Sequence, residues 1–86
     1  MKFRVYATRH ACLVVPDCMQ APQAASDRFG PLEFAGEIDE ADLAPAERAR
    51  ILRDIDAESY ALVPAHLAGR LLRLLARRDD ARTAEA

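Results

Sequence analysis

Leucine and basic residues recur at helical spacing in the segment from Pro64 to Arg78. At about 100° per residue, the leucines fall on one side of a helix and the basic residues on another. The leucines are Leu67, Leu71, Leu74 and Leu75. The basic residues are His66, Arg70, Arg73 and Arg77. A helix of this kind must bury its leucine side, so the rest of the chain has to supply an apolar surface for it.

A second helix is predicted before this one, beginning at Pro45 and ending near Ser59 or continuing to Leu62. Asp42 can cap it, and Pro45 suits a first helical turn because the proline has no N–H to leave unpaired. Its apolar side holds Ile51, Leu52 and Ile55, and another side holds Glu47, Asp54 and Glu58. The acidic side could face the arginines of the following helix, or those arginines could simply face solvent.

Two segments, Met1–Thr8 and Pro31–Ile38, alternate with a period of two residues, as strands with one buried face do. Their apolar positions are Phe3, Val5 and Ala7 in the first segment, and Leu32, Phe34 and Ile38 in the second. Gly36 takes an inward position, which indicates a bulge or a close approach of another part of the chain. The outward acids of the second segment complement the outward Lys2 and Arg4 of the first, so we expect the two strands to be neighbours.

The remaining segments complete the predicted fold. Residues 11–15 form either a second strand after a turn or the end of one long bent strand. A short helix is expected between Asp17 and Gly30, with Phe29 as its anchor to the core. We therefore predict an α+β fold: a small antiparallel sheet of two or three strands packed against two or three helices, with a helical C-terminal half. Residues 1–78 form the single domain, and residues 79–86 a frayed C-terminal tail.

Composition restricts the functions that such a chain can have. The net charge is -2, which argues against a general nucleic-acid binder. The sequence shows no leader peptide and no apolar run that could span a bilayer, and two cysteines are too few for a disulfide framework. These features favour a small soluble cytoplasmic protein. The excess of arginine over its single lysine is typical of a GC-rich bacterial genome.

Three residues, His10, Cys12 and Cys18, form the candidate cluster for zinc or thiol chemistry. Tetrahedral zinc needs four ligands, and His66 is the only other histidine in the sequence. A catalytic thiol would need one of the two histidines as a base. A disulfide between Cys12 and Cys18 is the remaining alternative, and inert packing is the favoured interpretation. We expect no catalytic residue, no metal and no cofactor.

Charge separation gives the preferred functional hypothesis. Residues 31–60 carry nine acids and three arginines, whereas residues 61–86 carry five arginines and three acids. The candidate interface residues are Glu37, Asp39, Glu40, Asp42, His66, Arg70, Arg73 and Arg77. We predict a non-catalytic binding or regulatory protein that acts through protein–protein contacts, such as an adaptor, an antitoxin or a phage- or plasmid-encoded inhibitor. The alternatives are a nucleic-acid binder that uses the arginine side of the last helix, and then a thiol- or zinc-dependent enzyme. The leucine-rich helix also permits a homodimer.

Overall fold

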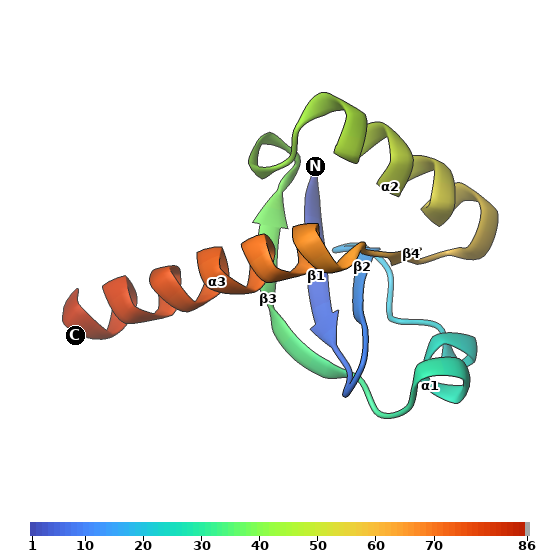
Figure 1. Ribbon diagram of the computed structural model, residues 1–86, viewed down its shortest axis with the longest axis horizontal. Helices are drawn as coiled ribbons and strands as arrows, with labels where there is room; N and C mark the ends of the chain where they lie inside the picture. The colour runs from blue at the N-terminus through green and yellow to red at the C-terminus, as the bar shows by residue number, and fades with distance from the viewer. Residues whose placement is uncertain (86) are drawn as a thin grey trace.

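The centre of the molecule is one antiparallel sheet, which contains four strands within residues 1–85 (Figure 1). It is seen in a computed structural model that describes these residues, with side chains as far as Asp79. The strands are β1 (Lys2–Ala7), β2 (Cys12–Pro16), β3 (Glu33–Asp39) and β4 (Ala61–Leu62), in the order β3-β1-β2-β4. The helices are α1 (Gln23–Phe29), α2 (Pro45–Glu58) and α3 (Ala65–Glu85), and a short 3₁₀ helix, η1 (Glu40–Asp42), follows β3. The α+β prediction is confirmed, but two or three strands was too few for the described residues.

A hairpin of β1 and β2 forms the middle of the sheet. Ala7 pairs with Cys12, so residues 8–11 make the turn. This turn has no Gly, Asn or Asp, and Thr8 closes it instead. Its Oγ1 accepts hydrogen bonds from the Ala11 N–H at 2.9 Å and the His10 N–H at 3.3 Å. A threonine hydroxyl can shape a turn in this way because it imitates a backbone carbonyl.

β3 pairs with the other side of β1, as the charge pattern predicted. Lys2 lies opposite Asp39 and Arg4 lies opposite Glu37, so opposite charges occupy neighbouring positions on the two strands. Cross-strand neighbours of opposite charge favour such a pairing by roughly 0.2–1 kcal/mol per pair. The charge pattern therefore supplied correct long-range information about the sheet.

A bulge in β3 changes which side chains face the core. Val5 pairs with Gly36 and Tyr6 with Phe34, which leaves Ala35 as an extra residue on β3. An extra residue shifts the alternation of faces, so Phe34 lies on the side of the sheet opposite Ile38 and is 55% exposed. The prediction that Phe34 points inward together with Ile38 was therefore wrong, although Gly36 had indicated the bulge.

Helices cover the two faces of the sheet unequally. In Figure 1, α3 crosses in front of the strands and α2 lies near the end where β1 begins. The core beneath these two helices contains Phe3, Val5, Cys12, Val14, Ile38, Leu43, Ile51, Ala61, Val63, Leu67, Leu71 and Leu75. A smaller cluster on the other face consists of Leu13, Val15, Ala25 and Tyr60, with Tyr6, Ala21, Phe29 and Leu32 against it. Phe29 meets Tyr60 edge to face at 6.1 Å between ring centroids, so its predicted role as an anchor is confirmed.

The strand that the sequence pattern did not reveal is β4. Ser59 takes the left-handed backbone conformation, with φ of 70°, and ends α2 there. The chain then enters the sheet, where Ala61 pairs with Val14 and Leu62 with Leu13. Two residues are too few to show a period of two, so the segment resembled a continuation of the helix.

α3 begins at Ala65, immediately after Pro64, and its backbone is helical to Glu85. Of its four predicted core leucines, Leu67, Leu71 and Leu75 are buried, whereas Leu74 is only half-buried. The predicted frayed tail, residues 79–86, falls mostly on residues whose side chains lie outside the described part. Within the described residues, no helix combines the length and hydrophobicity needed to cross a bilayer.

Candidate functional site

The basic residues predicted to share one side of the last helix do share it in the structure. We call them the arginine row: His66, Arg70, Arg73 and Arg77. All four side chains are exposed, whereas Leu67 and Leu71 on the other side of α3 are buried. The helical spacing of the sequence therefore positions this row correctly, and the remaining question is what each residue contacts.

Arg70 is committed to a contact within the chain. Its Nη2 lies 2.6 Å from Oε1 of Glu47, in the first turn of α2. The same oxygen accepts a hydrogen bond of 2.8 Å from the Ala44 N–H, an amide that precedes the helix and has no helical partner. The hydrogen bond from Arg70, and next the one from Ala44, hold the pKa of Glu47 below its ordinary value. Arg70 thus ties the start of α3 to the start of α2.

Arg73 and Arg77 are different, because neither forms an ion pair or hydrogen bond with any side chain among the described residues. Of the predicted acidic side chains of α2, Glu47 forms an ion pair with the arginine row. Among the described residues, Asp54 and Glu58 form no ion pair with it. Among residues 1–79, two of the guanidinium groups in the row therefore lie exposed with no carboxylate partner.

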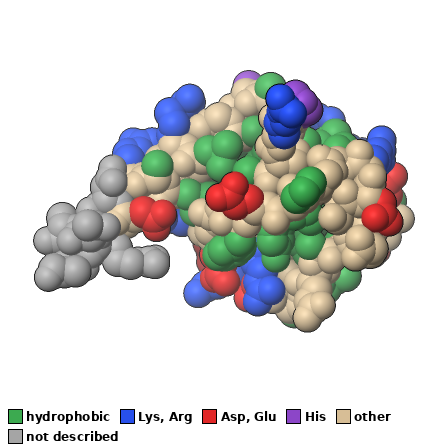
Figure 2. Space-filling view, turned by 90° about the horizontal axis from the view of Figure 1, so that it is seen from below, with side chains coloured by type: hydrophobic (Ala, Val, Ile, Leu, Met, Phe, Trp, Pro, Cys, Tyr) green, Lys and Arg blue, Asp and Glu red, His purple; other side chains and the backbone are tan. Residues whose placement is uncertain are grey.

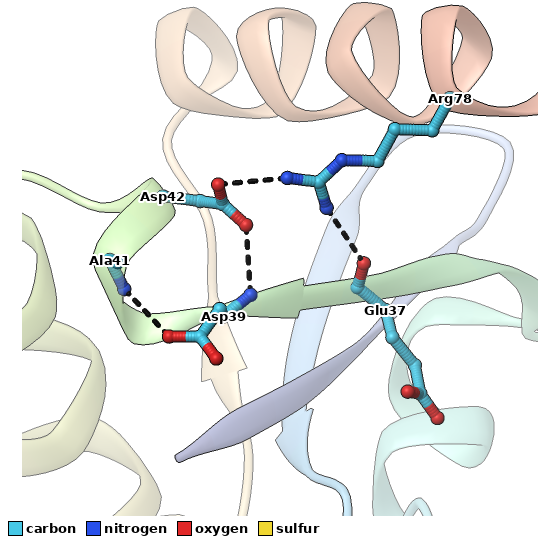
Figure 3. Close-up of polar contacts among 5 residues, drawn as sticks. All are labelled: Glu37, Asp39, Ala41, Asp42 and Arg78. Carbon is cyan, nitrogen blue, oxygen red and sulfur yellow. Dashed lines mark hydrogen bonds and ion pairs between the residues drawn. The ribbon is translucent and has the colours of Figure 1, made fainter. Parts of the chain in front are cut away.

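The predicted acidic turn is built largely from bonds within the chain (Figure 3). Asp42 Oδ2 accepts a hydrogen bond of 2.8 Å from the Asp39 N–H, and Asp39 Oδ1 accepts one of 3.1 Å from the Ala41 N–H. Glu40 lies 3.6 Å from the amino group of Met1. Asp39 is the N-cap of η1, and Asp42 completes the capping box of that short helix. The prediction that Asp42 caps α2 was wrong, because Ala44 occupies the N-cap position of α2.

Arg78 connects the acidic turn to α3 and was not among the predicted site residues. Its Nη2 donates to Oδ1 of Asp42 at 2.9 Å, and its Nη1 donates to the Glu37 carbonyl at 3.3 Å. The Asp39 N–H first, and the Arg78 guanidinium in addition, hold the pKa of Asp42 below its ordinary value. The Glu37 carboxylate points away from this cluster in Figure 3 and is exposed. Arg78 follows Leu71 by seven residues, a spacing that places it on the leucine side of the helix and could have identified it.

A hollow of about 750 Å³ lies beside the β1–β2 turn, between the end of α1 and the first turns of α3. Its lining consists of Thr8, His10, Ala11, Cys12, Arg28, Phe29, Leu62, Val63, Pro64, Ala65, Ala68 and Leu72. Figure 2 views the molecule from below and shows hydrophobic side chains gathered in patches on this face. Leu62 and Leu72 are exposed at 44% and 37%, so apolar surface borders the hollow. No sequence pattern indicated this hollow, because its lining residues come from separate segments of the chain.

The residues considered for metal or thiol chemistry are separated in the structure. Cys12 points into the core at the start of β2, whereas Cys18 is exposed in the turn after that strand. β2 spans about 13 Å at 3.3 Å per residue, well beyond the distance that a disulfide can bridge. Burial raises the pKa of Cys12 to about 11, which disfavours its thiolate. Among the described residues, no group of three or more His, Cys, Asp or Glu side chains is placed to hold a metal ion.

Comparisons with protein-family models, with curated proteins and with solved structures found no match for this chain. The contacts and exposure of the arginine row, the acidic turn and the hollow are therefore the basis for assigning a function.

Proposed function

We propose that this chain is a non-catalytic binding protein that contacts an acidic partner protein through the outward side of α3. The observation that carries the proposal is the difference between the arginines of one helix. Arg70 and Arg78 are each held by a carboxylate of the same chain. Arg73 and Arg77 are exposed and have no such partner among the described residues. They are the groups that remain available to a carboxylate from outside.

Arginine is well suited to this contact. Its planar guanidinium can give two parallel hydrogen bonds to one carboxylate, and it is enriched in protein interfaces. The Arg73 guanidinium lies next to Gly69, which has no side chain. A Cβ added at Gly69 would be 3.4 Å from Nη1 of Arg73. A pair of exposed guanidinium groups on one side of a helix favours a protein partner that offers carboxylates.

The acidic turn is a weaker candidate for the contact surface. Asp39 and Asp42 accept hydrogen bonds within the turn, and Asp42 also holds Arg78. Reversing their charge would disturb the fold as well as any interface, because buried or bonded charges cannot be replaced freely. Glu37 is the exception, since its carboxylate points outward and is exposed. A Glu37→Gln variant tests the acidic side without placing a like charge opposite Arg4 on β1.

The experiment compares two variants that lose the same charge. Both carry two Arg→Gln changes, at Arg73 and Arg77 in one variant and at Arg50 and Arg53 in the control. The control residues are exposed on α2. The tagged full chain captures partners from nuclease-treated extract of its own host, and binding to each recovered protein is then measured with purified components. We expect the α3 variant to weaken binding at least about tenfold, as loss of about 1.4 kcal/mol would, and the control to retain it.

Three results would contradict the proposal. A partner that binds the α3 variant as tightly as the original chain would remove Arg73 and Arg77 from the interface. Equal losses in both variants would show that net charge alone matters. Binding that disappears after nuclease treatment would favour a nucleic-acid partner instead, and its affinity should then fall steeply with salt concentration.

A further inference from the structure

The hollow beside the β1–β2 turn exists because the helices do not cover the whole face of the sheet. α2 packs near the end where β1 begins, and α3 crosses the middle of the strands (Figure 1). Neither α2 nor α3 covers the opposite end, where β1 turns into β2 and α1 lies to one side (Figure 1). The space is bounded instead by the last turn of α1, the residues after β4 and one side of α3.

That side of α3 is distinct from the arginine row. Ala65, Ala68 and Leu72 follow one another at spacings of three and four residues, so they form one stripe along the helix. The small side chains of the two alanines leave space in the hollow, and Leu72 and Leu62 supply its larger apolar surfaces. At about 750 Å³, the hollow lies in the range of small-molecule sites, roughly 300–1,000 Å³.

The only ionisable side chains with a cationic form in the lining are Arg28 and His10, and none of the lining residues is acidic. Arg28 is held in place from two directions. Its Nη1 donates a hydrogen bond of 3.3 Å to the Tyr60 hydroxyl, and its guanidinium carbon lies 5.1 Å from the centre of the Phe29 ring. Guanidinium has five N–H donors, and the Tyr60 contact uses one of them. No carboxylate among the described residues forms an ion pair with Arg28.

We propose that this hollow binds a small amphipathic carboxylate, with its apolar body against Leu62, Ala68 and Leu72 and its carboxylate on Arg28. An apolar lining with one anchored guanidinium matches a medium-length aliphatic acid or an aromatic monocarboxylic acid. Arginine binds a carboxylate through parallel hydrogen bonds, whereas a phosphate ester would meet too few polar groups in this lining. The proposal is independent of the partner surface on α3, because Arg73 and Arg77 do not line the hollow.

The probe is octanoate, with octan-1-ol as the neutral compound of the same chain length. Two-dimensional amide NMR of the ¹⁵N-labelled full chain follows each titration. We expect octanoate to shift the amides of residues 8–12, 28–29 and 62–72, with a dissociation constant on the order of 1 mM for a ligand of this size. Octan-1-ol should bind at least about tenfold more weakly, because it cannot accept the paired hydrogen bonds that Arg28 offers.

Three variants locate the site. Arg28→Gln removes the charge from an exposed position and should weaken octanoate binding at least about tenfold. Ala68→Leu adds volume to the wall of the hollow and should weaken octanoate and octan-1-ol alike. Arg53→Gln, an exposed arginine on α2, is the matched control and should bind octanoate like the original chain. The amide spectrum of each variant verifies that it is folded.

The proposal is overturned if neither octanoate nor 4-phenylbutanoate shifts these amides at concentrations up to about 10 mM. It is also overturned if Arg28→Gln binds octanoate as the control does, or if octan-1-ol binds equally well. Shifts confined to α2 or β3 would place any binding elsewhere. The variant that loses Arg73 and Arg77 should bind octanoate normally, so the failure of one proposal is distinguishable from the failure of the other.

Discussion

Replacing Gly36 with alanine should destabilise the protein more than any other single methyl group added at a described glycine. Gly36 has φ of +146°, a backbone conformation that residues with a side chain rarely adopt. An added Cβ would also lie 2.7 Å from Cδ2 of Leu75, a buried residue on the core side of α3. Two separate penalties therefore meet at this position, one from the backbone and one from packing.

The size of each penalty can be estimated. Backbone strain of this kind costs on the order of 1–3 kcal/mol, and overpacking a core costs typically 1–3 kcal/mol. Together they amount to roughly 2–6 kcal/mol, whereas a chain of this length is stable by only about 4–13 kcal/mol. Because 1 kcal/mol shifts the midpoint by about 4–8 °C in a small domain, Gly36→Ala should lower Tm by at least about 8 °C.

Urea denaturation of Gly36→Ala, with Gly30→Ala as the control, separates the two penalties. Gly30 also has positive φ, +88°, but an added Cβ there has no atom within 4 Å, so its change carries backbone strain alone. A double-mutant cycle with Leu75→Ala then measures the clash. Removing the Leu75 side chain should recover about 1–3 kcal/mol of the Gly36→Ala cost. Equal losses at the two glycines, or a cycle with no coupling, would refute the packing argument.

Two further predictions concern polar contacts. Thr8→Val should cost about 1 kcal/mol in urea denaturation, because Thr8 Oγ1 accepts the hydrogen bonds that close the β1–β2 turn, while Thr8→Ser should stay close to the original chain. Asp42 and Glu47 have folded-state pKa values below their ordinary 3.8 and 4.5, so their contribution to stability is complete above about pH 4.5 and is lost as pH falls through the folded-state values. A variant with Asp42→Asn and Glu47→Gln should therefore show a flatter stability curve in urea midpoints taken between about pH 7 and about pH 3; an unchanged curve would show that these carboxylates do not contribute.

Local sequence patterns correctly predicted the parts of the fold in which buried and exposed residues alternate regularly along the chain. The alternation of β1 placed Phe3 and Val5 in the core correctly. Opposite charges at Arg4 and Glu37 identified β1 and β3 as neighbours. The errors occur where one residue breaks the repeat. The extra residue at the β3 bulge turned Phe34 to the other face, and the left-handed backbone at Ser59 led into a strand too short to show any pattern.

The arginine row shows why the candidate site could be predicted only in part. Spacing along a helix gives the direction of each side chain, and Arg70 and Arg73 differ by only about 60° around the axis. That small difference separates an arginine bonded to Glu47 from one with no carboxylate among the described residues, because α2 lies on the Arg70 side. The partner of an arginine is thus decided by where the second helix packs, which depends on the whole core. Arg78 is the opposite case. Its position on the leucine side of α3 suggests burial, but at this point the helix lies beside β3 and Arg78 pairs with Asp42. The contacts of Arg73 and Arg77 are consequently set by the tertiary fold, which places no carboxylate of the described residues against either guanidinium.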